Sequence, residues 1–258
     1  MESSKTGIRA AEPSWVRQWL IHWPRRLHIA IDAAQYRTDR ARLLGYLAAG
    51  ASVVITGSKA LSAPPFCGAV LLSSALMEAA GEITAVPTGL ADYLSAADLP
   101  ERFTTATTGL VPVNLGLIAR WRAALTEWKK VDALSPSLRS TLSANLVDGW
   151  RRALSKLPGV EIMPTASKTV VNFVLYGLRG PFSLAETEAA YDQITSEGGI
   201  YIGQPVELTP GGAVALRLAV GAATLTRLSA GQYTDEELIA LAVDRVSRCT
   251  SIVERRRK

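Results

Sequence analysis

Cysteine and histidine are scarce in this chain of 258 residues, which contains only two of each. Cys67 and Cys249 lie far apart, and together with His22 and His28 they are too few for a zinc site. The chain also lacks the cysteine density of a disulfide-stabilised secreted domain, so a reducing cytoplasm is the natural setting. We therefore expect no metal and a cytoplasmic location.

Long apolar runs and a large excess of one charge are also missing. The longest nearly apolar stretch, Gly68–Ala80, contains Glu78 and is shorter than the ~20 residues that a membrane helix needs. Net charge is +5, and dense basic runs occur only at Arg151-Arg152 and Arg255–Lys258. A nucleic-acid-binding module, the weakest alternative, rests on these runs alone. With 48% hydrophobic residues, the composition is typical of a soluble globular protein that binds neither membranes nor nucleic acids.

The first half alternates short apolar runs with helical patterns. Strands are expected near residues 29–33, 52–56 and 68–72, and a helix over residues 38–49. A helix after Pro13 would place Trp15, Trp19 and Trp23 on one face, where we expect them to be buried. Strands separated by helices favour a parallel α/β sheet.

The second half has the pattern of a separate α+β layer. The sequence predicts a domain boundary close to Lys130, which gives domains of residues 1–130 and 131–258. Helices are expected over residues 115–131, 137–157, 183–196 and from 234 to the basic tail, and strands over residues 160–163, 170–176, 200–202 and 213–220.

Two strand ends in the first half carry polar residues. Asp32 ends the first predicted strand, and Thr56-Gly57-Ser58-Lys59 ends the second. Chemistry on parallel α/β sheets is expected at the carboxyl ends of the strands, so the carboxylate and the amine would face one crevice. The small and hydroxyl residues beside Lys59 leave its amine room and offer donors to a phosphate.

At these residues the sequence resembles the class V aminotransferase group of pyridoxal-phosphate enzymes, which have the fold type I architecture. The group's pattern is an Asp at a strand end, Gln or His three positions later, and a Schiff-base lysine preceded by Ser or Thr; Asp32, Gln35 and Thr56–Lys59 match it. Further similarity covers Ser3–Gly7, the turn from Pro64 to Gly68, and Leu216-Arg217-Leu218. The resemblance spans nearly the whole chain and is most specific over residues 29–72.

The resemblance implies pyridoxal 5'-phosphate as the cofactor. Lys59 would bind it as a Schiff base and serve as the base for a 1,3-proton shift, while Asp32 would pair with the pyridine nitrogen. Gln35 would hydrogen-bond the phenolic oxygen, and Thr56 and Ser58 would donate to the phosphate.

Arg217 would bind the carboxylate of the substrate, an amino acid or related amine. Its alternative role is a structural ion pair inside an apolar strand. Each other candidate also has a structural alternative: Asp32 as a turn residue, Lys59 as a solvated charge, and Gln35, Thr56 and Ser58 as ordinary loop residues. Cys67 is expected to be a small buried residue and not a nucleophile.

The resemblance also implies a long portion before the Asp strand, including a helix start that holds the phosphate. The 28 residues before Ile29 contain only a loop and a helix. We therefore expect the carboxyl-terminal part of a fold type I transferase: a partial parallel-sheet large domain and an α+β small domain. Two functions remain open: an aminotransferase-like enzyme, active as a homodimer or with a complementing chain, and a non-catalytic remnant or interaction subunit.

Overall fold

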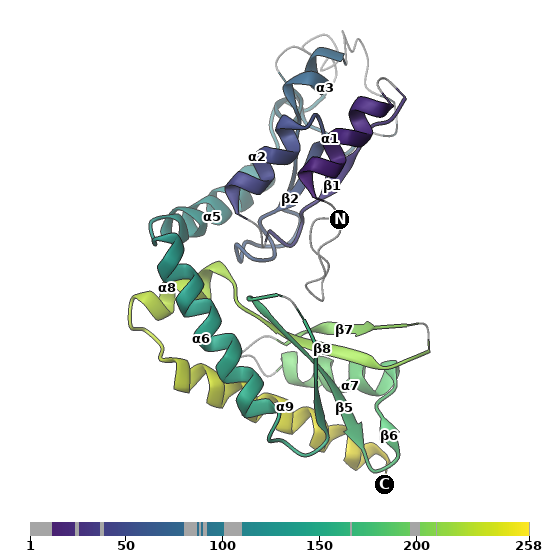
Figure 1. The fold of residues 1–258 in the computed structure, drawn as a ribbon, viewed down its shortest axis with the longest axis vertical. Coiled ribbons are helices and arrows are strands. Elements are labelled where there is room, and N and C mark those ends of the chain that lie inside the picture. Colours follow the sequence, from purple (N-terminus) through teal and green to yellow (C-terminus); the bar gives the residue numbers. More distant parts are fainter. Residues whose placement is uncertain are drawn as a thin grey trace. The chain divides into compact units, whose positions relative to one another are not determined.

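The computed structural model describes residues 12–23, 26–36, 39–79, 87, 89, 92–100, 110–165, 167–196, 202–209 and 211–257. These residues form two compact units, the first ending at Trp128 and the second beginning at Lys129 (Figure 1). The division falls close to the boundary at residues 130 and 131 that the sequence suggests. Assignment of the units as a cofactor-binding and a small domain stays a prediction.

The first unit contains a three-stranded sheet in the order β1-β2-β3. Strands β1 (Ala30–Asp32) and β2 (Ser52–Thr56) are parallel, with Asp32 opposite Val54. Strand β3 (Gly68–Leu71) is antiparallel to β2, so the expectation of a third parallel strand was wrong. Residues 57–67 contain no helix, and a parallel crossover needs about a dozen residues and usually a helix, so the chain closes a hairpin instead.

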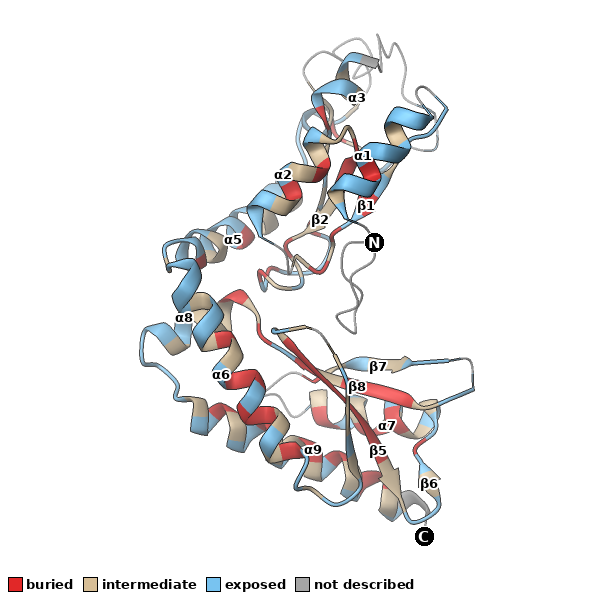
Figure 2. Ribbon diagram, in the orientation of Figure 1, coloured by how far each residue is buried: buried red, intermediate tan, exposed pale blue. Residues whose placement is uncertain are grey.

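Helices α1 (Pro13–His22) and α2 (Arg40–Ala48) pack with one face of this sheet. Proline at the first position starts α1, and the Asp39 carboxylate caps α2 by accepting a hydrogen bond from the Arg42 N–H at 2.7 Å. Figure 2 shows the buried residues gathered between these helices and the strands. The core they form contains Val16, Ile31, Ala33, Leu43, Tyr46, Ala51 and Val53.

Trp15 and Trp19 of α1 and Trp23, which follows the helix, are not buried, contrary to the expectation from their spacing. Trp15, Trp19 and Trp23 are 52%, 52% and 49% exposed. The helix packs on the sheet through Val16 and Leu20, which are also four residues apart. Consecutive residues are separated by about 100° around a helix, so this stripe displaces the tryptophans to a flank of α1.

Helix α5 (Leu115–Asp132) crosses the boundary between the units, and its first part packs against the β2–β3 hairpin. The Trp121 indole N–H donates a hydrogen bond to the Gly68 carbonyl at 3.1 Å, and Ala124 is fully buried. The first unit also contains α3 (Ser74–Ala79) and a 3-10 turn, η1 (Ala96–Asp98).

The second unit is an antiparallel sheet in the order β4-β5-β8-β7, with a short strand pairing to β5. The helices and strands predicted from the sequence are present here, except that residues 200 and 201 lie outside the described residues and β7 begins at residue 203. The strands are β4 (Val160–Met163), β5 (Val170–Gly177), β6 (Gly180–Pro181), β7 (Gly203–Glu207) and β8 (Val214–Ala219). The helices are α6 (Pro136–Leu154), α7 (Leu184–Ser196), α8 (Ala222–Ser229) and α9 (Asp235–Arg257).

Helices α6, α7 and α9 share one hydrophobic core with this sheet. Phe173, Leu216 and Leu218 contribute from the strands, and Trp150 donates its indole N–H to the Leu238 carbonyl of α9 at 3.3 Å. Because side chains alternate along a strand, Arg217 lies on the opposite face from Leu216 and Leu218. Among the described helices, none is long and apolar enough to cross a membrane.

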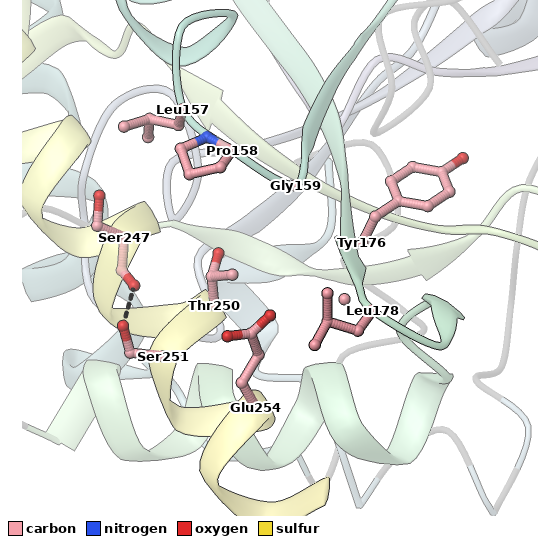
Figure 3. A pocket seen from close by; sticks show the side chains of 10 residues that line it. Leu157, Pro158, Gly159, Tyr176, Leu178, Ser247, Thr250, Ser251 and Glu254 are labelled. Atoms are coloured by element: carbon pink, nitrogen blue, oxygen red, sulfur yellow. Dashed lines mark hydrogen bonds between the residues drawn. The ribbon is translucent and has the colours of Figure 1, made fainter.

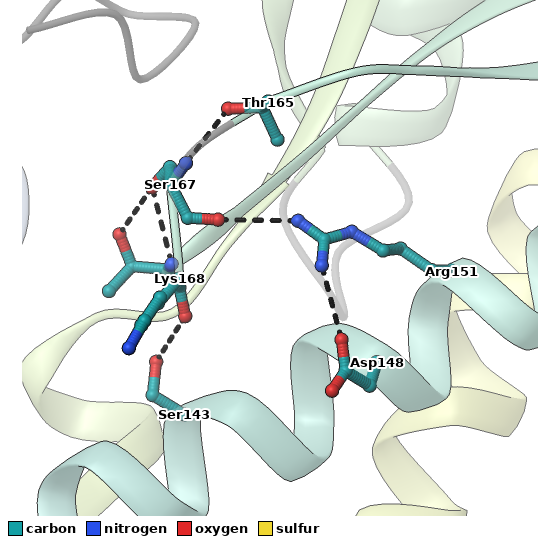
Figure 4. Close-up of polar contacts among 7 residues, drawn as sticks. Ser143, Asp148, Arg151, Thr165, Ser167 and Lys168 are labelled. Carbon is teal, nitrogen blue, oxygen red and sulfur yellow. Dashed lines mark hydrogen bonds and ion pairs between the residues drawn. The ribbon is translucent and has the colours of Figure 1, made fainter.

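Polar contacts attach the β4–β5 connection to α6 (Figure 4). The Arg151 guanidinium donates to the Ser167 carbonyl at 3.3 Å and pairs with Asp148 at 3.1 Å. The Ser143 hydroxyl donates to the Lys168 carbonyl at 2.9 Å. These bonds fix the backbone immediately before β5. Strand β5 pairs with β8, which carries Arg217.

Candidate active site

The carboxyl ends of β1 and β2 bring the two predicted motifs together. The Ala33 N–H donates to the Val54 carbonyl at 2.9 Å, so the chain after Asp32 stays beside β2. Ile31 and Val53 belong to the core under α1 and α2. Alternation therefore places Asp32, Val54 and Thr56 together on the other face of the sheet.

Asp32 and Gln35 occupy the turn that follows β1. The exposed Asp32 accepts a hydrogen bond from the Ala34 N–H at 2.9 Å through Oδ1, which is the turn role considered from the sequence. Within the described residues, Oδ2 has no hydrogen-bond partner. Gln35 is only 8% exposed, and its amide has no partner among the described residues either. Both side chains therefore have polar groups that are available to a ligand.

Lys59 projects from a loop whose backbone is held in place. The Gly57 N–H donates to the Cys67 carbonyl at 2.8 Å, and the Ser62 N–H donates to the Lys59 carbonyl at 3.0 Å. The Lys59 side chain is exposed, and its amine forms no ion pair within the described part of the chain. The loop also lies against α5: a Cβ at Gly57 would be 2.5 Å from the Cβ of Ala124. A rigid loop thus presents a free amine.

The two hydroxyls beside Lys59 are already hydrogen-bonded. Thr56 Oγ1 donates to the Cys67 carbonyl at 2.6 Å, and it accepts from the Ser58 N–H at 3.2 Å. A hydroxyl has one proton, so Ser58 must be the donor in its 2.8 Å contact with Thr56. Thr56 therefore has no proton left for a phosphate, whereas Ser58 has one if it turns away from Thr56.

Cys67 is fully buried, as expected from the sequence. Burial raises the pKa of its thiol, with the neighbouring Gly57 backbone and Arg120 acting in the opposite direction. A raised pKa lowers the fraction of thiolate at neutral pH, and the thiolate is the nucleophilic form. The structure thus gives Cys67 the properties of a packing residue.

Arg217 belongs to β8 of the second unit. In register it lies between Asn172 on β5 and Gly203 on β7. Its guanidinium donates to the Gln204 carbonyl at 2.8 Å. Burial lowers its pKa, and no carboxylate within the described residues pairs with it. The alternative of a structural ion pair is therefore not observed in the described residues.

Sequence reasoning did not find the groups that hold these candidates. Trp121 and Ala124 support the Lys59 loop, and Gly203 lies against Arg217, but nothing in their sequence context distinguishes them from ordinary helix and strand residues. The Ser3–Gly7 segment of the resemblance lies outside the described residues. A pocket of about 440 Å³ in the second unit shares no residue with the candidate site (Figure 3). Its lining includes Leu157, Tyr176, Leu178 and Glu254.

Comparisons with known proteins identify the fold. No protein-family model matches the chain, and no curated protein does. Solved structures do match: a tryptophan decarboxylase from Catharanthus roseus in complex with L-tryptophan has a TM-score of 0.52 at 16% identity, over 96% of this chain and 49% of that one. A cysteine desulfurase from Escherichia coli has a TM-score of 0.56 at 16% identity, over 96% and 57%.

A 4-hydroxyphenylacetaldehyde synthase from Rhodiola rosea matches with a TM-score of 0.53 at 14% identity, over 98% of this chain and 48% of that one. The chain thus spans about half the length of the proteins it matches. At such identities the matches show the fold alone. The chain has the mixed α/β fold of the carboxyl-terminal part of fold type I pyridoxal-phosphate enzymes.

Proposed function

We propose that this chain binds pyridoxal 5'-phosphate through Lys59 and acts as an aminotransferase-like enzyme on an amino acid or related amine. The observation that carries the proposal is the free Lys59 amine close in sequence to Thr56, which shares a sheet face with Asp32 at the carboxyl ends of neighbouring parallel strands. The fold supports it, because the matched structures are pyridoxal-phosphate enzymes of fold type I.

The residues at the ring end of the proposed site fit the cofactor. A carboxylate is the partner that keeps a pyridine nitrogen protonated, and Asp32 Oδ2 has no partner in the described residues. The largely buried Gln35 amide can donate to a phenolic oxygen. The Lys59 amine is free to condense with an aldehyde.

Fewer hydrogen-bond donors are available for the phosphate of the cofactor. Of the two hydroxyls predicted to bind phosphate, only Ser58 can donate without breaking the bond to Cys67. A phosphate normally binds where several backbone N–H groups converge at a helix start. Within the described residues, Ser58 is thus the main side-chain donor beside Lys59.

The roles of the chain's own residues follow from these contacts. When bound, the cofactor supplies an electron sink for the negative charge that develops at the substrate Cα. Lys59 Nζ would accept the proton from Cα and return it to the carbon two atoms further along, which is the 1,3-proton shift, and Asp32 would stabilise the positive charge on the pyridine nitrogen. Arg217 would bind the substrate carboxylate, because its half-buried side chain pairs with no carboxylate in the described residues.

Transamination is favoured over desulfuration within this proposal. Burial raises the pKa of Cys67 and raises that of Cys249 to about 12, so neither thiol is suited to nucleophilic attack.

The second candidate function is a non-catalytic interaction subunit. Trp15, Trp19 and Trp23 favour it, because each is about half exposed and exposed apolar side chains can form an interface.

A spectroscopic titration separates these two functions. We expect the chain mixed with pyridoxal 5'-phosphate to develop a visible absorption band that disappears on borohydride reduction. Lys59→Ala should abolish the band, whereas Lys129→Ala, a change at another lysine, should leave it intact. A chain that develops no such band at any cofactor concentration is not an enzyme of this type.

A further inference from the structure

A side chain at Gly203 of β7 would collide with the side chain of Arg217 on the neighbouring strand β8. A Cβ placed on Gly203 would lie 2.4 Å from Arg217 Cγ, 2.6 Å from its Nε and 2.8 Å from its Cζ. Gly203 and Arg217 are register partners on adjacent strands, so the arginine side chain lies directly over the glycine. Only a residue without a side chain leaves this space open.

The backbone next to Gly203 also fixes the direction of the guanidinium. The Gln204 carbonyl accepts one N–H of Arg217 at 2.8 Å. A guanidinium has five N–H donors, so the others remain for a ligand, and carboxylates bind such a planar group through two parallel hydrogen bonds. Arg217 is half-buried, and no carboxylate in the described residues pairs with it, so its free N–H donors are available to an anion.

We infer that Gly203 is a positioning residue: its missing side chain forms a slot that holds the Arg217 guanidinium in place to bind a carboxylate ligand. The carboxylate class of the ligand rests on the proposed function, whereas the slot rests on the contacts between β7 and β8. Any side chain at position 203 would push Arg217 out of the slot and away from the Gln204 carbonyl.

Acetate is the probe for this slot, and it needs neither cofactor nor turnover. In the full chain labelled with ¹⁵N-arginine, the Arg217 Nε–H resonance is assigned from its loss in Arg217→Lys. We expect acetate, but not the neutral acetamide, to shift this resonance. Gly203→Ala should weaken acetate binding about tenfold or more, because one charge-assisted hydrogen bond of the pair is lost. Gln204→Ala is the control, since its carbonyl belongs to the backbone.

A second measurement tests whether Gly203 acts through Arg217. Gly203→Ala should lower the urea midpoint of unfolding in the parent chain, but much less in an Arg217→Ala background, where the obstructing side chain is gone. Equal losses in both backgrounds, equal acetate binding by the parent and Gly203→Ala, or no acetate shift in the parent would each overturn the inference. An acetate shift in a chain whose Lys59 binds no cofactor would refute the proposed function and leave the slot intact.

Discussion

The two oxygens of the Asp32 carboxylate have different surroundings. Oδ1 accepts the Ala34 N–H, and Oδ2 is available to a ligand within the described residues. Asp32→Asn keeps an acceptor for the turn, so the chain should fold as before. It removes the negative charge that would stabilise the pyridine nitrogen in the proposed site, so turnover in the active assembly should fall on the order of 10²-fold or more. Steady-state kinetics with circular dichroism measures both effects, and unchanged turnover would show that Asp32 is not the cofactor's partner.

Cys67 offers a separate test at the residue scale. Its thiol is buried with a raised pKa, so the reactive thiolate is depleted at neutral pH and becomes more populated only as the pH rises. We expect iodoacetamide at about pH 7.5 to leave Cys67 unmodified in the native chain and to alkylate it in urea, as read by peptide mass spectrometry. Rapid alkylation of the native chain would contradict a packing role.

The sequence predicts some site contacts and not others. The parallel pairing of β1 and β2 was expected because each is a short apolar run, whereas the approach of Lys59 to Asp32 stays a prediction. The bond from Thr56 to Cys67 was not predictable, because it depends on the antiparallel return of β3. The contact of Gly203 with Arg217 depends on strand register, which the amino-acid pattern does not specify here.

At the scale of elements, the β2–β3 hairpin lies unusually close to α5. A methyl group at Gly57 would meet Ala124 Cβ at 2.5 Å and Cys67 Sγ at 2.8 Å. Gly57→Ala should therefore destabilise the chain by about 1–3 kcal/mol, because the loop and the helix must separate. Urea unfolding measures the change. Gly68→Ala is the matched control in the same hairpin, since nothing lies within 4 Å of its added Cβ; equal effects of the two would disprove the close approach.

The start of a helix with a strong local signal was predicted well. Helix α6 starts at Pro136, one residue before the predicted start, after the Ser135 cap, whose hydroxyl accepts from the Leu138 N–H at 3.2 Å. It ends at Leu154, three residues before the predicted end, although Gly159 has a positive φ of 71°. Helix α8 was not predicted. It is short, and Gly221 gives it no side-chain cap, so its existence depends on packing against α6 rather than on local sequence.

At the scale of the whole molecule, the sequence prediction differs most from the structure in which apolar residues are buried. A stripe of tryptophans predicts a core face, but the sheet in this unit contacts Val16 and Leu20 instead. A pattern in one helix indicates an apolar face without indicating what lies opposite it. We propose that a second copy or a complementing chain covers the tryptophan flank.

Exposed tryptophans on this flank should cause the chain to self-associate. We expect the apparent mass of the purified chain in light scattering to rise with concentration, because three half-exposed tryptophans can be buried between copies. Trp19→Gln should reduce this rise. Leu138→Gln is the control, because Leu138 is similarly exposed, at 41%, but lies in the second unit. A parent chain that stays monomeric at all concentrations would count against the second copy.

Chemical trapping identifies the lysine that holds pyridoxal 5'-phosphate, which we propose to be Lys59. The chain is mixed with the cofactor, reduced with borohydride, digested, and its modified lysines are identified by mass spectrometry. We predict a pyridoxyl group on Lys59, which is exposed and lies in the loop after β2, the strand that pairs with Asp32. Modification of other lysines, with Lys59 unmodified, would contradict the proposed site.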